Sequence, residues 1–518
     1  MIGTFTGINT VTLALEAQQA AQDTTGHNIS NANTTGYSRQ TANLTTMPSL
    51  TIYQGGGPVQ LGTGVNVASI TRARDSFIDN QYRQQNAAKN FWQSQTDELS
   101  QVENIFTDTN DDGLQASINA FYTSLQTLGA NANDVGARTN VRETANSMVQ
   151  VIQQDAQHLR DIANDLTNQI STQVSNINNI AQQVAALNKQ IVTQESSGSA
   201  ANDLRDQRDQ LLDQLSAITN VQTSEDKSGA VSVSVAGVSL VQNTTVNPLM
   251  LKDQHNDTYN FDSSTVTQAN GLSGTLTFTG GSLASAFQLR DQTVTGYLDN
   301  LNNVAQFLLQ DFNNQQQAGQ DNNGTTTKAA VVGPPAVAAS TVALMFGSLP
   351  TGTLPAAANP YSTAAAYTPP NNDWLDQLQV NPLLYTTSGL NYIAASAKGA
   401  AGTADGTNAL ALANVLYNDP SPAPSPANAL GNVSLSNYYN TMIGTLGVQS
   451  QQASNMNDNQ AVLLTSTTNW RESVSGVSTD EEMSNMITFQ KAYGAAATVL
   501  STMNSMLNTL IASVGGTV

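Results

Sequence analysis

The chain has 518 residues, of which 39% are hydrophobic, which is enough for several folded domains and argues against wholesale disorder. Its 18 basic and 38 acidic residues give a formal net charge of −20, so nucleic acid and anionic membrane surfaces would be repelled. Cysteine is absent, which excludes disulfides, cysteine-ligated zinc and cysteine nucleophiles. No apolar run is long enough to span a bilayer, so we expect neither a membrane nor nucleic acid as a partner.

The first predicted element is a weakly amphipathic helix near the N-terminus. Ile8, Val11 and Leu15 recur at the spacing of one helix face, and residues 17–21 continue in a small, helix-compatible run. Residues 28–40 are rich in Asn, Ser, Thr and Gly, which favour turns and local side-chain caps. We therefore expect the helix to end there in a sharp turn.

The pattern from residue 91 to residue 218 is helical. One helix face is predicted over 114–128, and a longer Gln- and Asn-rich helix carries apolar residues seven apart over 170–191. A break at 195–199 separates this helix from another one over 204–218. These segments predict a long, rod-like helical bundle.

The period then changes to that of β-structure. Residues 231–235 alternate Val with Ser, and Val238 and Leu240 resume after a Gly, which predicts a hairpin with one buried face. Residues 275–278 are predicted as another strand. Helical spacing returns over 289–312 and indicates a segment that rejoins the bundle.

Residues 321–430 differ from the rest in composition. Gly, Pro, Ala, Thr and Ser dominate, and Pro-rich runs occur at 334–335, 369–370 and 420–426. We interpret this stretch as a small β-rich outer domain with Pro-rich connectors. A closing helix is expected from about residue 438.

The last predicted helix carries an apolar stripe of coiled-coil type. Ser478 and Glu481 match a capping box, so the helix should start near Thr479. No charged residue occurs from 492 to 518, so other subunits are expected to cover the outer face. The periodicity fits equally well a C-terminal helix docked on its own domain. The stripe consists of Met486, Phe489, Tyr493, Ala496, Leu500, Met503, Leu507, Leu510 and Val514.

Both ends of the chain resemble bacterial flagellar rod, hook and hook-associated proteins. Residues 28–37 are similar to the N-terminal signature of these families, with His27 where Asn is frequent, and residues 475–493 look like their matching C-terminal segment. The joint presence of the two blocks is specific. Residues 202–213 and several shorter internal matches resemble the hook-associated protein 1 family in particular, although Gln316 stands where that family often has His.

This resemblance, which covers about 1–320 and 430–518, implies a mainly α fold with a β-rich insertion. The terminal helices would form a coiled-coil-like pair, next to a long helical rod domain and outer β-rich domains. The expected division is a terminal assembly domain of 1–45 and 478–518, a rod domain of 46–222, 284–320 and 430–477, and an outer insertion of 223–283 and 321–429.

The resemblance also implies a structural junction protein that polymerises on the hook tip and adapts hook to filament. Expected partners are further copies in a ring or helical layer, hook protein below, a second junction protein and filament components above, and a cytoplasmic export chaperone. Since the first basic residue is Arg39 and Glu16 interrupts the early apolar positions, no cleaved signal peptide is expected. Export would instead use the flagellar type III apparatus and place the protein outside the cell. The alternatives are another axial protein of hook or distal rod, and an adhesin acting through 321–429.

The terminal segments supply the candidate site residues. The chaperone is expected at Met486, Tyr493, Leu500 and Leu507. The expected assembly interface comprises Ile8, Val11, Leu15, Asn28, Ile29, Asn31, Gly36, Tyr37, Met486, Phe489, Tyr493, Leu500, Met503, Leu507, Leu510 and Val514.

No motif for catalysis or metal binding stands out, so we expect no enzyme activity and no cofactor. Residues 108–113 copy half of a calcium loop but lack its terminal Glu, which favours a turn. His27, His158 and His255 are far apart and show no ligand spacing. The acidic run 480–482 is explained by its place in the first turn of a helix.

Overall fold

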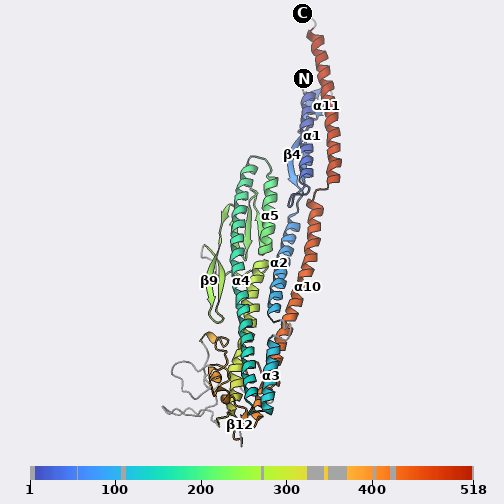
Figure 1. Ribbon diagram of the computed structural model, residues 1–518. Coiled ribbons are helices and arrows are strands. Elements are labelled where there is room, and N and C mark those ends of the chain that lie inside the picture. Colours follow the sequence, from blue (N-terminus) through green and yellow to red (C-terminus); the bar gives the residue numbers. More distant parts are fainter. Residues whose placement is uncertain are drawn as a thin grey trace.

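The computed structural model describes residues 6–54, 57–106, 113–269, 274–323, 343–347, 370–400, 404–419 and 428–515. The molecule is elongated (Figure 1). Helix α1 (Thr6–Ser30) begins and helix α11 (Thr479–Gly515) ends toward the same tip, and the described segments 370–400 and 404–419 lie at the opposite end. The mainly α fold class with a β-rich insertion is confirmed.

The two terminal helices pack side by side in antiparallel orientation. Gly7 lies against the side chain of Met503, and Gly26 lies against that of Met486. A Cβ at Gly7 would lie 3.1 Å from Met503 Cε, so the missing Cβ at Gly7 lets the helices approach closely, whereas Gly26 makes an ordinary contact. The coiled-coil-like pair is therefore as predicted. Helix α11 starts at Thr479, also as predicted, and the Ser478 hydroxyl accepts a 3.4 Å hydrogen bond from Glu481 N.

Two short hairpins accompany α1 and were not predicted. The strands are β1 (Gln40–Thr46), β2 (Leu50–Gln54), β3 (Gly57–Leu61) and β4 (Val65–Arg72), paired antiparallel as β1 with β4 and β2 with β3. Residues 46–72 were expected in the helix-rich rod. The sequence pattern misses these strands because β1 is mostly polar and neither β1 nor β4 has a consistently buried face.

The rod is built from long helices that run along the molecular axis (Figure 1). They are α2 (Ser76–Phe106), α3 (Leu114–Ala130), α4 (Val135–Ser196), α5 (Asn202–Ile218) and α10 (Leu435–Ser475). The 62 residues of α4 span about 93 Å at 1.5 Å per residue. Its predicted heptad positions Ile170, Ile177, Val184 and Ile191 are all buried, which confirms the rod-like bundle.

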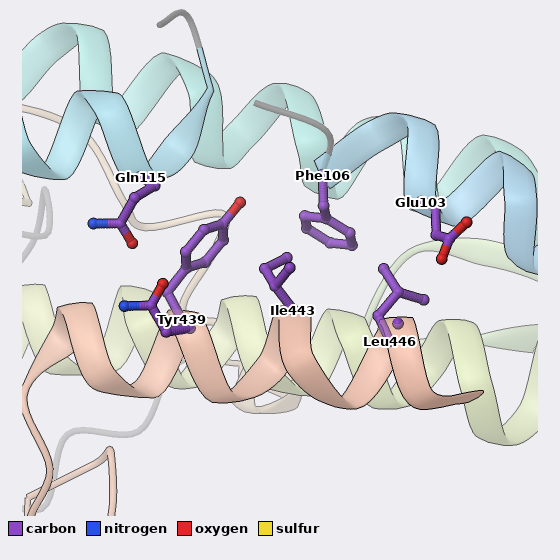
Figure 2. Close-up of a pocket in the computed structure, with 8 residues that line it drawn as sticks. Glu103, Phe106, Gln115, Tyr439, Ile443 and Leu446 are labelled. Carbon is purple, nitrogen blue, oxygen red and sulfur yellow. The ribbon is translucent and has the colours of Figure 1, made fainter. Parts of the chain in front are cut away.

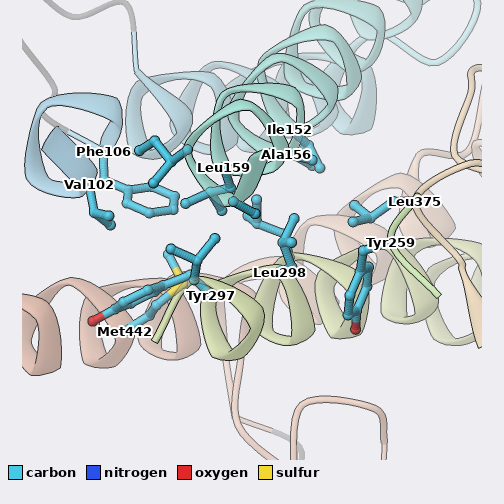
Figure 3. Close-up of a cluster of buried hydrophobic side chains, with 14 of the residues drawn as sticks. Val102, Phe106, Ile152, Ala156, Leu159, Tyr259, Tyr297, Leu298, Leu375 and Met442 are labelled. Carbon is cyan, nitrogen blue, oxygen red and sulfur yellow. The ribbon is translucent and has the colours of Figure 1, made fainter. Parts of the chain in front are cut away.

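A third helical segment completes the core, as predicted from 289–312. It consists of α6 (Gly281–Gln288), α7 (Thr295–Phe307) and α8 (Asn313–Ala318), joined by the π-helical turns Leu289–Val294 and Leu308–Phe312. Figure 3 shows side chains of α2, α4, α7 and α10 meeting in one cluster, with Phe106, Leu159, Leu298 and Met442 among them.

The β-rich insertion packs against α4. It contains β5 (Val221–Glu225), β6 (Val231–Val235), β7 (Val238–Gln242), β8 (Thr245–Val246), β9 (Leu249–Asn256) and β10 (Phe261–Gln268), in a β5-β6-β7-β8 sheet and a β9–β10 hairpin. The three valines of β6 are buried, which confirms the predicted hairpin. The strand predicted at 275–278 is wrong: one backbone hydrogen bond, from Leu276 N to Val266 O, ties this segment to β10, so no ladder forms.

The described parts of 321–429 also differ from the prediction of a β-rich domain. They contain short 3₁₀ turns, the helix α9 (Thr407–Tyr417) and the two-residue strand β12 (Ser396–Ala397), which pairs with β11 (Gly319–Gln320). The Ala- and Leu-rich run of α9 favours helix over strand. Most of the Pro-rich runs lie outside the described residues.

This distal segment is fastened to the rod by a buried arginine. The Arg138 guanidinium, on α4, donates hydrogen bonds to Leu390 O at 3.0 Å and Ile393 O at 2.8 Å. Burial lowers the pKa of Arg138 to about 10, so it remains charged at neutral pH. The segment is therefore part of the rod's base. Among the described helices, none combines the length and apolar character that crossing a bilayer requires.

The central role of α4 yields a stability prediction. Ile177→Ala, at a fully buried position, should lower the free energy of unfolding by about 2–5 kcal/mol because it leaves a cavity in the bundle. Val135→Ala, at a 65% exposed position of the same helix, should change it by less than about 0.5 kcal/mol. Chemical denaturation followed by circular dichroism measures both, and equal effects would contradict the assigned core.

Candidate assembly surface and its polar joint

The seam between α1 and α11 holds most of the predicted interface residues. Tyr493 and Leu510 are exposed, and Val514 lies in α11 with a side chain outside the described set. The seam residues Ile8, Val11, Leu15, Met486, Phe489, Leu500, Met503 and Leu507 are half-buried. The stripe is thus covered on one side within the chain itself, as in the alternative of a helix docked on its own domain.

The outer side of α11 carries a second apolar surface, which the heptad count did not predict. Its exposed fractions run from 45% at Val499 to 67% at Met506. No element covers this side in Figure 1, where α11 has α1 on one flank only. We call Met483, Ile487, Val499 and Met506 the outer face of α11, because they project from the half of the helix that faces away from the seam. Leu510 and Ile511 are exposed on the seam side, where α11 continues past the described start of α1 near Met503.

Asn28 is the pivot between the end of α1 and the start of α11. Its side chain is buried, and its amide nitrogen donates to Gln40 O at 2.8 Å and to Glu482 Oε2 at 2.9 Å. Its amide oxygen accepts from the Tyr37 hydroxyl at 2.7 Å and from Gln40 N at 2.9 Å. Because these four hydrogen bonds use both sides of its amide group, Asn28 positions the end of α1 against the start of α11.

The other predicted residues of the turn support this pivot. Gly36 has a φ of +84°, a conformation that strains any residue with a Cβ. Asn31 donates to His27 O at 3.0 Å, and Ile29 is half-buried. Burial raises the pKa of Tyr37, with the nearby carboxylates adding to the effect, so its phenol stays protonated and donates to Asn28.

Glu482 ties α11 to the rest of the molecule. Only 3% of its side chain is exposed, and it accepts a 2.8 Å charged hydrogen bond from Arg39 Nε. Arg39 also lies 3.2 Å from the largely exposed Glu481. In addition, Arg39 N donates to Ser475 O at 2.9 Å. The acidic residues Glu481 and Glu482 in the first turn of α11 therefore form ion pairs with Arg39, which hold the start of α11 against the segment that follows α1.

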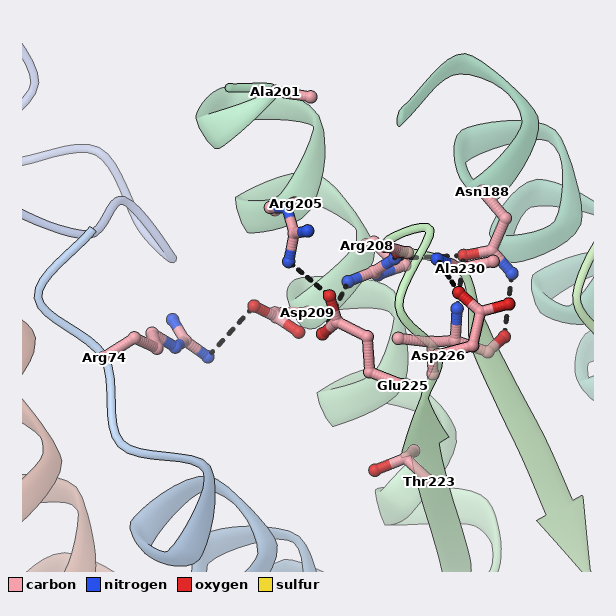
Figure 4. A network of polar contacts seen from close by, with 12 residues as sticks. Arg74, Asn188, Ala201, Arg205, Arg208, Asp209, Thr223, Glu225, Asp226 and Ala230 are labelled. Carbon is pink, nitrogen blue, oxygen red and sulfur yellow. Dashed lines mark hydrogen bonds and ion pairs between the residues drawn. The ribbon is translucent and has the colours of Figure 1, made fainter. Parts of the chain in front are cut away.

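Three aspartates on one side of α5 extend this contact into a network that we call the polar joint. Asp206 accepts from Ser38 N at 2.9 Å and from Arg72 at 2.6 Å. Asp209 pairs with the same Arg72 at 2.9 Å. Figure 4 shows the further ion pair of Asp209 with Arg74, at 3.8 Å.

The third aspartate, Asp213, connects the polar joint to α2 and α10. Asp213 pairs with Arg83 of α2 at 3.0 Å and with Arg471 of α10 at 2.6 Å, and the Arg471 guanidinium lies 3.6 Å from the ring centroid of Tyr82. The linkers before β1, after β4 and before α11 all pass beside this acidic side of α5. The joint thereby fixes the terminal helix pair to the rod.

The joint shifts the ionisation of its most central member. Burial alone would raise the pKa of Asp209, but the surrounding guanidinium groups of Arg74, Arg72 and Arg83 outweigh burial and hold it below its usual value. The carboxylate is therefore charged at neutral pH, as the pairing requires.

The described residues offer little for metal or ligand chemistry. They contain no group of three or more His, Asp or Glu side chains placed to hold a metal. His27 contacts Tyr37, His158 contacts Gln154, and His255 lies beside Asp262. The calcium-like run 108–113 falls outside the described residues except for Gly113, which caps α3.

One cavity, of about 420 Å³, lies between α2, α3 and α10. Phe106, Ile443 and Leu446 form its apolar side, and Glu103, Gln115 and Tyr439 its polar side (Figure 2). Glu103 is the one carboxylate in the lining, so the cavity holds no acid–base pair of carboxylates.

Family models match the two ends and the middle of the chain. Residues 8–37 match the flagella basal body rod protein model, 472–513 the C-terminal model of the flagellar basal body rod FlgEFG proteins, and 99–330 the helical domain of the flagellar hook-associated protein FlgK. Flagellar hook-associated protein 1 of Bacillus subtilis is 30% identical over 531 residues, covering 99% of each chain. The chain belongs to the flagellar hook-associated protein 1 family.

Other members agree with this assignment. The Escherichia coli flagellar hook-associated protein 1 is 29% identical, over 97% of this chain and 99% of its own. The flagellar hook junction protein FlgK from Burkholderia pseudomallei has the same fold, with a TM-score of 0.59 over 76% of this chain and 100% of its own at 17% identity.

Membership of the hook-associated protein 1 family makes the chain a structural component of the bacterial flagellum, a hook–filament junction protein and not an enzyme. The two end models cover α1 with its turn and nearly all of α11. The two end models thus coincide with the terminal helix pair, while the aspartates of the polar joint and their arginine partners lie outside them.

Sequence reasoning missed the polar joint and the outer face of α11. Asp206, Asp209 and Asp213 recur at helical spacing, and this signal would have marked one acidic side of α5. Their arginine partners Arg72, Arg74 and Arg471 are remote in sequence, so these ion pairs could not be predicted from the sequence.

The buried ion pair predicts a strong effect of Glu482→Gln. The change keeps the shape but removes the charge that Arg39 and Asn28 contact, and should cost about 1–3 kcal/mol. Hydrogen exchange of α11 amides in the purified protein measures the loss. Glu481→Gln, whose side chain is 64% exposed, serves as control and should cost less than about 1 kcal/mol; equal losses would contradict the role of Glu482.

The joint should also loosen in acid. Because the folded pKa of Asp209 lies below the unfolded value of about 3.9, its stabilisation is complete above that value and is lost as pH falls through the folded pKa. Asp209→Asn should lower stability at pH 7 and flatten this acid transition, measured by thermal melts from pH 7 to pH 2. The exposed Asp458→Asn should behave as wild type. An unchanged acid transition in Asp209→Asn would exclude this role.

Proposed function

We propose that this chain polymerises on the hook tip as a ring or helical layer of identical copies. Hook protein would lie below the layer, and a second junction protein with filament components above it. The supporting observation is the outer face of α11, an apolar surface on the side turned away from α1 that no described element covers. Exposed apolar surface of this extent commonly marks a protein interface.

The driving force would come from burying this face. Each large apolar side chain moved from water into a packed interface contributes about 1.5–3 kcal/mol, offset by the cost of ordering the segment. Because α1 begins and α11 ends at the same tip, copies arranged around a channel would place 1–45 and 478–518 in an inner layer. The rod would form the next shell, with the β-rich insertion outside it.

Before assembly, we propose a cytoplasmic chaperone on the stripe of α11, followed by export through the flagellar type III apparatus without a cleaved signal peptide. The stripe residues Met486, Leu500 and Leu507 are half-buried in the seam with α1. A chaperone that binds Met486, Tyr493, Leu500 and Leu507 would therefore take the place of α1, and the two helices would be separated in the chaperone complex.

The role of the outer face can be tested in cells by replacing Ile487 and Met506 with Asp. Burial of two charges without partners should abolish incorporation into flagella and leave hooks without filaments in electron micrographs. Ser171→Asp adds the same charge to exposed surface of α4, away from α11, and should retain incorporation. Normal filaments in the double variant would contradict the proposal.

The terminal pair is also expected to order on assembly. With one apolar side uncovered, α1 and α11 should show weaker hydrogen-exchange protection than the rod helices in the free monomer, and stronger protection in the polymer. Removal of 480–518 should abolish both chaperone binding and incorporation. Rigid terminal helices in the free monomer, or incorporation of the truncated chain, would count against this mechanism.

A further inference from the structure

The upper two-thirds of α10 are covered on one side only. Leu446, Ala453, Thr467 and Ser475 are buried and recur at helical spacing, on the side where α10 runs along α2 (Figure 1). The remainder of the helix surface from residue 447 onward is largely exposed.

The opposite side of α10 carries a row of exposed apolar side chains. Val448, Val462 and Trp470 are 66%, 69% and 46% exposed. At 3.6 residues per turn they project within about 80° of one another, and the uncharged, exposed Asn455 and Ser466 lie between them on the same side. We call Val448, Asn455, Asn459, Val462, Ser466 and Trp470 the lateral face.

The upper end of the lateral face is widened by α2. The ring of Phe77, itself 66% exposed, lies edge-on to Trp470 with centroids 6.3 Å apart. Two aromatic rings held against each other in solvent form a preorganised contact, since neither must be immobilised on binding.

The six residues of the lateral face are uncharged in a chain of net charge −20, and the exposed Asp458 lies at the edge of the face, one turn before Val462. From residue 435 to residue 470 the one charged side chain is Asp458. Copies of so acidic a protein repel one another at long range, so contact between copies requires a surface that brings no further negative charge together. The Asn and Ser residues between the apolar anchors are short and uncharged, and they allow close approach of a second helix.

We propose that the lateral face binds a second copy of this chain within the same layer. This inference rests on the proposed polymerisation and adds where neighbouring copies touch. The face runs about 33 Å from Val448 to Trp470 along the long axis of the molecule, at 1.5 Å per residue. With the terminal pair inward and the rod outward, copies arranged around a channel would lie side by side along the rod, where the lateral face is exposed.

The contact is tested by photocrosslinking in isolated flagella. A benzophenone amino acid replaces Val462 in the full-length chain, and a second variant carries it at the exposed Gln157 of α4 as control. Irradiation should yield a product of two copies of this chain from position 462 and none from position 157. A product that contains another flagellar protein, or no product despite incorporation, would overturn the lateral contact.

A charge substitution separates this inference from the proposed function. Val448→Asp with Val462→Asp should lower incorporation at least about tenfold, because two apolar contacts are replaced by repelling charges. Hydrogen exchange of α11 and binding of the chaperone should remain as in wild type. Normal incorporation of this variant would overturn the lateral contact alone, while failure of the wild-type chain to enter the junction would overturn the proposed function as well.

Discussion

The architecture of this protein depends on a buried set of ion pairs between one acidic side of α5 and arginines from other parts of the chain. Asp206, Asp209 and Asp213 contact Arg72, Arg74, Arg83 and Arg471. Charges removed from water are costly unless each has a partner of good geometry, so the network forms as a unit or not at all. The network therefore gives the terminal helix pair a single orientation on the rod. Apolar packing alone is less directional and would let the pair slide.

Charge is distributed unevenly over the surface of the protein. The chain is strongly acidic, yet α10 and the distal part of α11 are almost uncharged on their open sides. Acidic residues elsewhere keep the free chain soluble and hold copies apart, while the neutral helices offer the few places where close approach costs little. Long-range repulsion and short-range attraction are thereby carried by different elements of one molecule.

Much of the fold was readable from periodicity because long helices repeat their apolar residues many times. The heptads of α4 and the start of α11 at Thr479 were predicted from this signal, and the alternation of Val231 to Val235 marked the hairpin. The strands β1 to β4 and the form of 321–429 were not, because short, polar or Pro-rich segments take their structure from contacts with remote parts of the chain. The contact between Asn28 and Glu482 could not be predicted for the same reason: the signature marks Asn28, but its partner lies at the other end of the chain.

The hydrogen bond between Asn28 and Glu482 joins residues that are 454 positions apart in sequence. Closing so long a loop is entropically costly and comes late, so local helices of the rod should fold well before the two ends meet. During synthesis, the first helix must wait for nearly the whole chain to be made before its counterpart exists. The α1–α11 pair can therefore form only after α11 has been synthesised. A chain that ends before α11 cannot form this pair.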